Sequence, residues 1–342
     1  MLPLWARIRA RCLQEDWPPR PGCKYFLRSN YWREQLQPNV LPLKVAGAML
    51  KTCLILNPKA GSATELPHLK QRIAEQLPGA KIKTTGRSGS AERAARQATA
   101  EGFELIVAAG GDGTLNEVVN GISGQLDSVA LGLLPLGTGN DFARSAGVPQ
   151  NVEQALQTLR AAVTRRIDLV RVTTSRERHF LNVSAGGFSG LVDAKLTREI
   201  KSSWGPLAYL RSAASAFKDL QAYPTTISLD DQECLSLKVY NIVVANGRYV
   251  AGGMPIAPQA SIDDGLLDLV ILRETSAARL ALTAPRVLRG SHLEDETVVY
   301  RRAARVCVNP RASMPFNLDG ELLSEGAITF QVMPRALQFV MP

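Results

Sequence analysis

The sequence has 342 residues, of which 45% are hydrophobic and 21% charged, and these values indicate a globular protein with a substantial core. Its longest apolar runs have the length of a strand, so we expect no transmembrane helix. The formal net charge of +9 fits an anionic nucleotide or an anionic membrane surface, and we expect no nucleic-acid partner.

The five cysteines are widely spaced and form no CxxC pair. This spacing argues against a zinc site and a disulfide framework, and it favours a reducing compartment such as the cytoplasm. The three histidines are scattered as well, which gives little support to a metal-hydrolase or Ser–His site.

Residues 1–48 differ from the rest of the chain. They hold three of the four tryptophans, scattered arginines and no sustained hydrophobic period. A targeting leader is one interpretation, although acidic residues and the lack of a cleavable apolar core weaken it. A start at Met49 is another, because the first strand begins directly after it. We favour a poorly ordered or non-native extension that takes no part in catalysis.

Strands and helices alternate over residues 49–168. The pattern predicts strands at 52–56, 80–85, 105–109 and 129–135, and helices at 66–77, 90–100 and 152–164. This alternation is typical of βαβ units, so we expect a Rossmann-like α/β nucleotide-binding domain with a parallel sheet. The C-terminal tail is expected to return to this domain.

The most informative stretch begins at the third of these strands. Gly110, Gly111 and Gly113 follow it, and they let the backbone turn sharply and approach a ligand. We expect Thr114 to cap the next helix. The free N–H groups and the dipole at that end favour a phosphate. The alternative is an ordinary glycine turn without a ligand.

Asp112 lies within this glycine turn, and a carboxylate there would repel a phosphate unless a cation lay between them. The sequence therefore favours a magnesium–nucleotide site. Polar turns at 57–62, 110–114 and 137–141 each follow a predicted strand. Because the carboxyl ends of parallel strands share one edge of a sheet, we expect the three turns to form one nucleotide site.

The character of the chain changes near residue 168. Short strands rich in Val, Ile and Thr are predicted at 169–173, 180–185, 225–229, 239–245, 266–272, 305–308 and 327–332. We expect one long helix among them, at 206–220. Residues 169–330 are therefore interpreted as a β-sandwich-like substrate domain.

Two acidic turns lie in this second half. Residues 260–268 place three carboxylates before a strand, and carboxylates with backbone carbonyls are how Mg²⁺ is held, although such a turn without an ion is equally common. Residues 316–321 place Asp319 and Glu321 around a glycine. Taken alone this is a hairpin turn, but beside a nucleotide a carboxylate can accept a hydroxyl proton.

Two familiar nucleotide motifs are missing from the sequence. No GxxxxGK[ST] occurs, so the chain is not a P-loop enzyme. Position 142 is Phe where the dinucleotide fingerprint has its third glycine, which counts against a dehydrogenase.

Four segments in order, 57–61, 110–114, 136–144 and 319–321, closely resemble the soluble diacylglycerol kinase-like lipid kinases, the family that includes sphingosine and ceramide kinases. The likeness runs from about residue 51 to the C-terminus. It implies an α/β nucleotide domain and a β-sandwich lipid domain flanking a cleft, and transfer of the γ-phosphoryl group of ATP to a lipid hydroxyl.

The resemblance also implies roles for particular residues. Glu321 matches the proton acceptor, and Asp319 would orient it or the metal. A magnesium site would use the carbonyls of Ser261 and Leu266 and the side chain of Asp264. The positions that match ATP contacts, with Thr84 as an alternative to Thr85, are Asn57, Thr85, Gly110, Gly111, Asp112, Gly113, Thr114, Leu115, Asn116 and Thr138.

Two further features are carried over from the family. Asp112, Asp141 and Asp168 resemble a carboxylate–water network around the catalytic magnesium. The stretch 206–220 resembles a helical region over the lipid entrance.

The leading interpretation is thus an ATP- and Mg²⁺-dependent kinase of diacylglycerol or a related lipid, in the cytoplasm with peripheral membrane contact. One rival is an NAD kinase-like phosphotransferase, which carries a similar glycine turn. Another is a nucleotide-binding regulatory module without chemistry. The sequence does not choose among lipid acceptors, and a homodimer remains an option.

Overall fold

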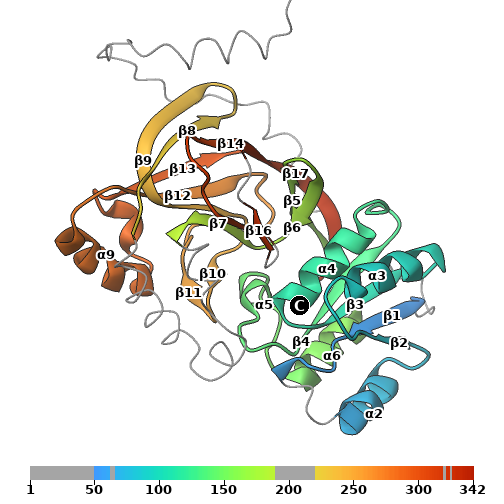
Figure 1. Ribbon diagram of the computed structural model, residues 1–342. Helices are drawn as coiled ribbons and strands as arrows, with labels where there is room; N and C mark the ends of the chain where they lie inside the picture. The colour runs from blue at the N-terminus through green and yellow to red at the C-terminus, as the bar shows by residue number, and fades with distance from the viewer. Residues whose placement is uncertain (1–49, 62–65, 189–219, 319–320, 324–325) are drawn as a thin grey trace, which may run out of the picture. The chain divides into compact units, whose positions relative to one another are not determined.

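The computed structural model of the chain (Figure 1) describes residues 50–61, 66–188, 220–318, 321–323 and 326–342. Within these residues a 15-stranded sheet runs without a break from an α/β part into a β part. The strand order along its main path is β16-β15-β7-β9-β8-β14-β17-β4-β3-β1-β2.

The α/β part contains a parallel sheet with helices on both faces. Its strands are β1 (Thr52–Leu56), β2 (Lys81–Thr84), β3 (Leu105–Gly110) and β4 (Ala130–Pro135), paired in the order β2-β1-β3-β4. Its helices are α2 (Leu66–Gln76), α3 (Ser90–Ala100), α4 (Asp112–Ile122), α5 (Asp141–Ser145) and α6 (Val152–Ala161).

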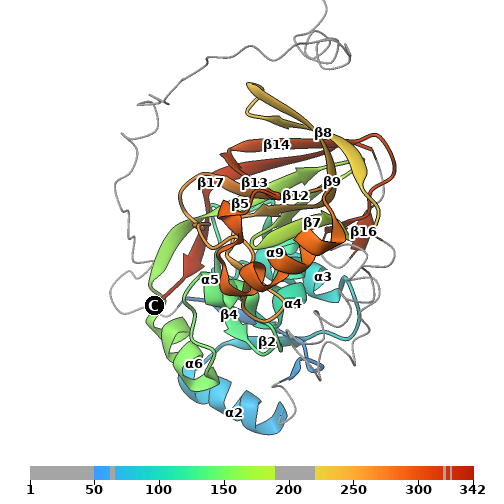
Figure 2. The same ribbon diagram turned by 90° about the vertical axis from the view of Figure 1, so that its left-hand side faces the viewer.

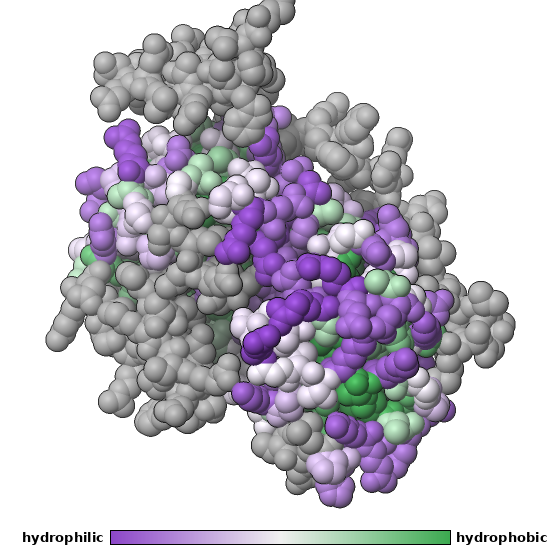
Figure 3. Space-filling view, turned by 45° about the vertical axis from the view of Figure 1, so that its right-hand side comes forward, coloured by the Kyte–Doolittle hydropathy of each residue, from purple (hydrophilic) through white to green (hydrophobic). Residues whose placement is uncertain are grey.

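The two faces of this sheet belong to separate apolar cores. Alternate residues of the strands pack with α3, α4 and α5 on one side and with α2 and α6 on the other. Three of the strands are buried at every position, which explains why their sequences are continuous apolar runs. Figure 3 shows one side of the molecule, where hydrophilic residues form a band across the middle and hydrophobic ones gather lower in the view.

The β part is a sheet that folds over itself at one long strand, β9 (Glu233–Ala245). The first half of β9 pairs with β8 (Tyr223–Leu229), and its second half pairs with β7 (Val183–Gly187) and β12 (Leu267–Arg273). A single core of strand side chains, including Phe316 and Phe330, lies between the two layers. This arrangement is the predicted β-sandwich-like part.

Two strands join the parts. In β5 (Thr164–Thr173) and β17 (Ile328–Val340) the chain forms a long antiparallel ladder, and the end of β17 pairs in parallel with β4. The ladder is irregular between Met333 and Leu337, where Arg335 has a φ of 49°. Residue 168 lies inside β5, so the change from one part to the other occurs within a strand.

The remaining elements are β6 (Glu177–Phe180), β10 (Tyr249–Val250), β11 (Met254–Pro255), α9 (Ala277–Arg289), the 3₁₀ helix η4 (His292–Glu294), β13 (Val298–Ala303), β14 (Arg305–Pro310), β15 (Phe316–Leu318) and β16 (Glu321–Leu323). Figure 2 shows α9 in front of the β part, on the side that faces left in Figure 1. No helix among the described residues is long and apolar enough to cross a membrane.

Several predicted elements need correction. The helix predicted at 152–164 ends at Ala161, because Ala162 adopts the left-handed conformation and Thr164 already begins β5. The strand predicted at 180–185 is two strands, β6 and β7. Helix α9 was not predicted, because Pro285 lies inside it and proline normally indicates the end of a helix. The helix predicted at 206–220 lies outside the described residues, apart from its last position.

Candidate functional site

Three turns meet at the ends of β1, β3 and β4. The side-chain amide of Asn57 donates to the Thr114 hydroxyl at 3.2 Å, which joins the first turn to the second. The second and third turns touch through their backbones, since a Cβ added at Gly137 would lie 2.5 Å from the Gly111 Cα. The shared rim that the sequence predicts is therefore present.

The N-terminus of α4 opens onto this rim. The helix begins at Asp112 with Gly111 as its N-cap, and this glycine has no side chain to bond the N–H groups of the first turn. The prediction that Thr114 is the N-cap is wrong, because Thr114 lies inside the first turn and is buried. An uncapped first turn presents N–H groups and the positive end of the helix dipole, which together suit an anion.

Asp112 turns its carboxylate toward the third turn. Its Oδ2 accepts from the backbone N–H of Asp141 at 3.1 Å, and its Oδ1 accepts from that of Phe142 at 3.0 Å. Asp112 thus takes the capping role for the short helix α5, whose own N-cap Asn140 makes no such bond. Asn140, in a left-handed conformation, instead closes its own turn by exchanging two bonds with Gly137.

Asp141 carries the connection into the β part. Its carboxylate accepts from the backbone N–H of Gly252 at 3.0 Å and from that of Gly253 at 2.7 Å, in the turn between β10 and β11. Burial, followed by the nearby charge of Asp112, raises the pKa of Asp141 to about 6. A Cβ added at Gly139 would lie 3.2 Å from an oxygen of Asp141 and 3.5 Å from one of Asp112, so both carboxylates flank this glycine.

The predicted ATP-contacting residues differ in how much of each can face the rim. A Cβ added at Gly61 would lie 3.4 Å from the Thr138 hydroxyl, which places Thr138 beside the first turn. Thr85 is buried, and both its N–H and its hydroxyl donate to the Leu56 carbonyl at the end of β1. The side chain of Leu115 packs in the apolar core, so only its backbone can face a ligand.

The turn predicted to hold magnesium has a different construction. The Asp264 carboxylate pairs with the Arg302 guanidinium and accepts from the backbone N–H of Leu266 at 3.1 Å. The Ser261 hydroxyl donates to Asp263 at 2.7 Å. Burial raises the pKa of Asp264 and Arg302 opposes this shift. The Arg302 side chain, from β13, thus supplies a positive charge to this turn.

Asp168 contacts this second turn directly. Its carboxylate is fully buried and accepts from the backbone N–H groups of Gly265 and Arg335, each at 2.7 Å. Burial raises its pKa to about 6, against the effect of these two bonds. The carboxylate–water network of all three aspartates that the resemblance implied stays a prediction.

The predicted proton acceptor is placed only through its backbone. Glu321 begins β16 and is paired with Leu318 of β15, which in turn pairs with β7. The side chain of Glu321 and the whole of Asp319 lie outside the described residues. Their roles therefore stay predictions.

Sequence reasoning missed three contributors to these turns. Gly252 and Gly253 supply the N–H groups that hold Asp141, and Arg302 neutralises Asp264. Arg144 ends the segment 136–144 that carries the family resemblance, and its Nε donates to the Gly139 carbonyl at 3.3 Å. The two glycines form a visible pair in the sequence, whereas nothing local connects Arg302 with Asp264.

Among the residues that the structure describes, no group of three or more His, Cys, Asp or Glu side chains could hold a metal ion. The pair of Asp112 and Asp141 is the nearest approach to a cation site on the rim. Each carboxylate oxygen has more than one lone pair, so the bonds to backbone N–H groups leave acceptor capacity on both residues.

Comparisons with known proteins place this geometry in a family. Residues 51–172 match the diacylglycerol kinase catalytic domain, and residues 182–341 match the YegS C-terminal NAD kinase beta sandwich-like domain. The chain is 33% identical over 299 residues to the diacylglycerol kinase of Bacillus subtilis (strain 168), covering 86% of this chain and 97% of that protein.

Two further comparisons agree with this assignment. A protein named "Probable lipid kinase YegS-like" from Pseudomonas aeruginosa (strain UCBPP-PA14) is 33% identical over 295 residues, covering 85% of this chain and 94% of that protein. The fold matches a crystal structure of a diacylglycerol kinase candidate from Bacillus anthracis str. Sterne, with a TM-score of 0.73 and 24% identity. The match covers 87% of this chain and 98% of that chain. The chain therefore belongs to the family of diacylglycerol kinases and YegS-like lipid kinases, and it is a transferase of the kinase class.

Proposed function

We propose that this kinase transfers the γ-phosphoryl group of ATP to a hydroxyl group of diacylglycerol or a related membrane lipid, with magnesium as the metal. The observation that carries the proposal is the convergence of three polar turns at the uncapped N-terminus of α4. A helix end that presents N–H groups beside glycines is suited to bind a triphosphate.

On this proposal the rim binds the nucleotide mainly through backbone groups. The phosphates lie at the first turn of α4, over Gly111 and Gly113, where a side chain is lacking and the backbone can approach the ligand. Thr138 and Asn57 flank them from the neighbouring turns. The bond between Asn57 and Thr114 holds two of the turns at a fixed separation before the nucleotide arrives.

The chemistry of the rim fits magnesium. Two carboxylates, Asp112 and Asp141, lie side by side, and burial, followed by the charge of Asp112, raises the pKa of Asp141. A bound magnesium ion would offset that repulsion and the negative charge of the triphosphate. The turn at 261–266 does not fit equally well, because Arg302 already neutralises Asp264. We derive no catalytic role for a metal there.

Glu321 is the proposed proton acceptor. The lipid hydroxyl gives its proton to the Glu321 carboxylate as its oxygen forms a bond to the γ-phosphorus, and the bond from that phosphorus to the bridging oxygen breaks to leave ADP. Asp319 would hold Glu321 or the metal in position. Because the lipid lies in a membrane, we also propose that the protein contacts the bilayer peripherally.

The test uses ATP labelled in the γ-phosphate, mixed lipid vesicles and, in a parallel reaction, NAD. We expect label in a lipid product and none in NAD. Glu321→Gln should lower turnover by roughly 10²–10⁴ and leave ATP affinity near that of the wild type, since a general base contributes about this much.

The matched control is Glu233→Gln, at the exposed start of β9, whose ion pair with Arg301 is on the surface. It should leave turnover unchanged. Unchanged turnover in Glu321→Gln would reject the base assignment. ATP binding without any labelled lipid would reject the proposed reaction and favour a regulatory nucleotide-binding protein.

A further inference from the structure

Helix α9 exposes more apolar surface than its surroundings. Among the described residues three large hydrophobic side chains are exposed, and two of them, Leu282 at 66% and Leu288 at 40%, belong to this helix. Val163, at 38%, is the third and lies at the start of β5 in the α/β part. The outward side of α9 continues with smaller exposed residues, Ala277, Ala278, Ala281 and Pro285.

The charge on α9 is of one sign. The helix contains three arginines and no acidic residue. Arg279 pairs with Glu296 at 2.5 Å and Arg286 pairs with Asp295 at 3.1 Å, so their acidic partners come from the segment behind the helix. The helix thus presents leucine and alanine, and at its C-terminal end the exposed Arg289, which has no acidic partner among the described residues. This composition is suited to the interface of an anionic bilayer.

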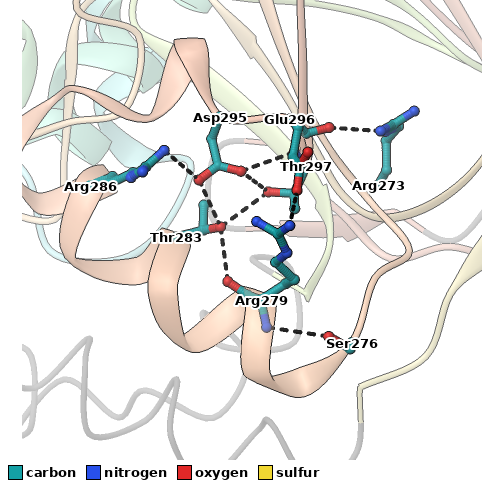
Figure 4. A network of polar contacts seen from close by, with 8 residues as sticks. All are labelled: Arg273, Ser276, Arg279, Thr283, Arg286, Asp295, Glu296 and Thr297. Atoms are coloured by element: carbon teal, nitrogen blue, oxygen red, sulfur yellow. Dashed lines mark hydrogen bonds and ion pairs between the residues drawn. The ribbon is translucent and has the colours of Figure 1, made fainter.

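The inner side of α9 is fixed by polar contacts. Figure 4 shows the Thr283 hydroxyl next to Asp295 and Thr297, all three of which are buried. The Ser276 hydroxyl accepts from the Arg279 N–H and caps the helix at its start. Because the inner side is held at several points, the exposed face is presented in one orientation, and little ordering is needed for docking.

Helix α9 lies beside the hairpin that binds Asp141. It packs against β11, and a Cβ added at Gly290, directly after the helix, would lie 3.1 Å from a Pro255 side-chain atom. The same hairpin carries Gly252 and Gly253, which donate to Asp141. A surface that is bound through α9 is therefore connected to the nucleotide rim by a short path of contacts.

We propose that the exposed face of α9 docks this protein on a bilayer that contains anionic lipid. The choice of a bilayer rests on the proposed function, which requires the enzyme to reach a membrane-embedded hydroxyl. Charge disfavours a second copy of the chain as the occupant, because a symmetric contact would bring together two helices that each carry Arg289, unpaired within the described part of the chain, and no acidic residue. It suits anionic headgroups, which attract arginine near the membrane surface.

The experiment is sedimentation of the full chain with vesicles of phosphatidylcholine alone or of phosphatidylcholine with phosphatidylglycerol. The wild type should bind the anionic vesicles more tightly, and salt should weaken the binding. The double variant Leu282→Ser/Leu288→Ser should bind roughly 10- to 100-fold more weakly, because two leucines no longer enter the bilayer. Arg289→Gln should lower the affinity about fivefold for anionic vesicles only.

The control is Val163→Ser, which removes an exposed apolar side chain from another part of the surface and should leave vesicle binding unchanged. Equal binding by the double variant and the wild type would overturn the proposal, as would failure of the wild type to bind anionic vesicles. A wild-type dimer in analytical ultracentrifugation that the double variant converts to monomer, without loss of vesicle binding, would also overturn it and assign the face to self-association.

Turnover on detergent-dispersed diacylglycerol separates this proposal from the proposed function. The double variant should keep wild-type turnover there, because none of its changes touches the rim. If the wild type phosphorylates no lipid while the leucine changes still abolish vesicle binding, docking stands and the kinase proposal fails. If turnover is normal but the leucine changes leave vesicle binding intact, docking fails and the kinase proposal stands.

Discussion

Two acidic turns of this protein look similar in sequence and differ in the source of their positive charge. At Asp112 and Asp141 the carboxylates accept from backbone N–H groups, and they lie next to each other. At Asp264 and Asp268 the guanidinium of Arg302 lies between two carboxylates, paired with Asp264 and 3.5 Å from Asp268. The first turn favours an added cation, whereas the second contains its own.

The comparison shows why an acidic cluster is a weak sign of a metal site. The number of carboxylates is similar in the two turns. What distinguishes them is that Arg302, on β13 and far from Asp264 in the sequence, pairs directly with that carboxylate. Burial raises the pKa of Asp141 and the nearby Arg144 opposes this shift, but the Arg144 Nε donates to the Gly139 carbonyl. A bound metal stabilises a buried carboxylate less when a guanidinium is already paired with it, because the negative charge is already offset.

The largest effect should come from removing a charge at the first turn. Asp112→Asn should lower turnover by about 100-fold or more, because the metal and the triphosphate lose a charged partner that is worth several kcal/mol. Asp264→Asn, the matched change at the second turn, should lower turnover by less than about threefold. Steady-state kinetics at saturating lipid measure both. Equal losses in the two variants would remove the distinction between the turns.

The backbone contact between the rim turns can be broken without changing charge. Gly137→Ala would place a Cβ 2.5 Å from the Gly111 Cα and 2.8 Å from the Asn140 side-chain oxygen. We expect the free energy of unfolding to fall by roughly 2–3 kcal/mol, with weaker ATP binding, because backbone atoms cannot move aside cheaply. Denaturant unfolding is the measurement.

The control for that change is Gly124→Ala, where a Cβ would meet nothing within 4 Å. It should be neutral or slightly stabilising. A Gly137→Ala variant as stable as this control would mean that the two turns are further apart than described.

The buried carboxylate of the second turn should give a pH dependence. The pKa of Asp168 is raised from 3.8 to about 6 in the folded state, so between these values the folded protein holds a proton that the unfolded chain has lost. This contribution to stability is present at low pH and is lost as the pH rises toward 6, by on the order of 3 kcal/mol.

Asp168→Asn should therefore flatten the stability curve between pH 4 and pH 6 relative to the wild type. Unfolding in denaturant at several pH values measures the difference in the free energy of unfolding between wild type and variant. Contributions from carboxylates elsewhere are the same in both proteins and cancel in this difference. Parallel curves for wild type and variant would show that Asp168 is ionised throughout.

The smallest effect concerns the arginine itself. Arg302 is partly exposed, so Arg302→Gln should cost less than about 1 kcal/mol of stability. The informative readout is the response to magnesium. We expect added Mg²⁺ to raise the unfolding midpoint of Arg302→Gln more than that of the wild type, and an identical response in both proteins would contradict the role given to Arg302.

Local sequence determined much of the α/β part. The helix at 90–100 and the strand at 52–56 occur at their predicted bounds, because periodicity and continuous apolar runs are local signals. The parallel order of the strands also explains why three separate turns could be expected on one rim. The end of α6 was misplaced because a left-handed alanine, Ala162, has no sequence signature.

Long-range pairing could not be predicted in this way. The long strand β17 crosses both parts of the molecule, yet its sequence shows only a strand from 327 to 332. The bonds from Gly252 and Gly253 to Asp141, and the pairing of Arg302 with Asp264, join residues distant in the chain. Such contacts depend on the register of the folded sheet rather than on a local pattern.

Calorimetric titration of ATP, with and without Mg²⁺, into the wild type, Asp112→Asn and Asp264→Asn tests the central claim most directly. We predict that Mg²⁺ tightens ATP binding to the wild type and to Asp264→Asn, and that this gain is lost in Asp112→Asn. If the gain survives in Asp112→Asn and disappears in Asp264→Asn, the metal binds at the turn of Asp264, and this result would contradict our assignment of the metal and the nucleotide to the turn of Asp112.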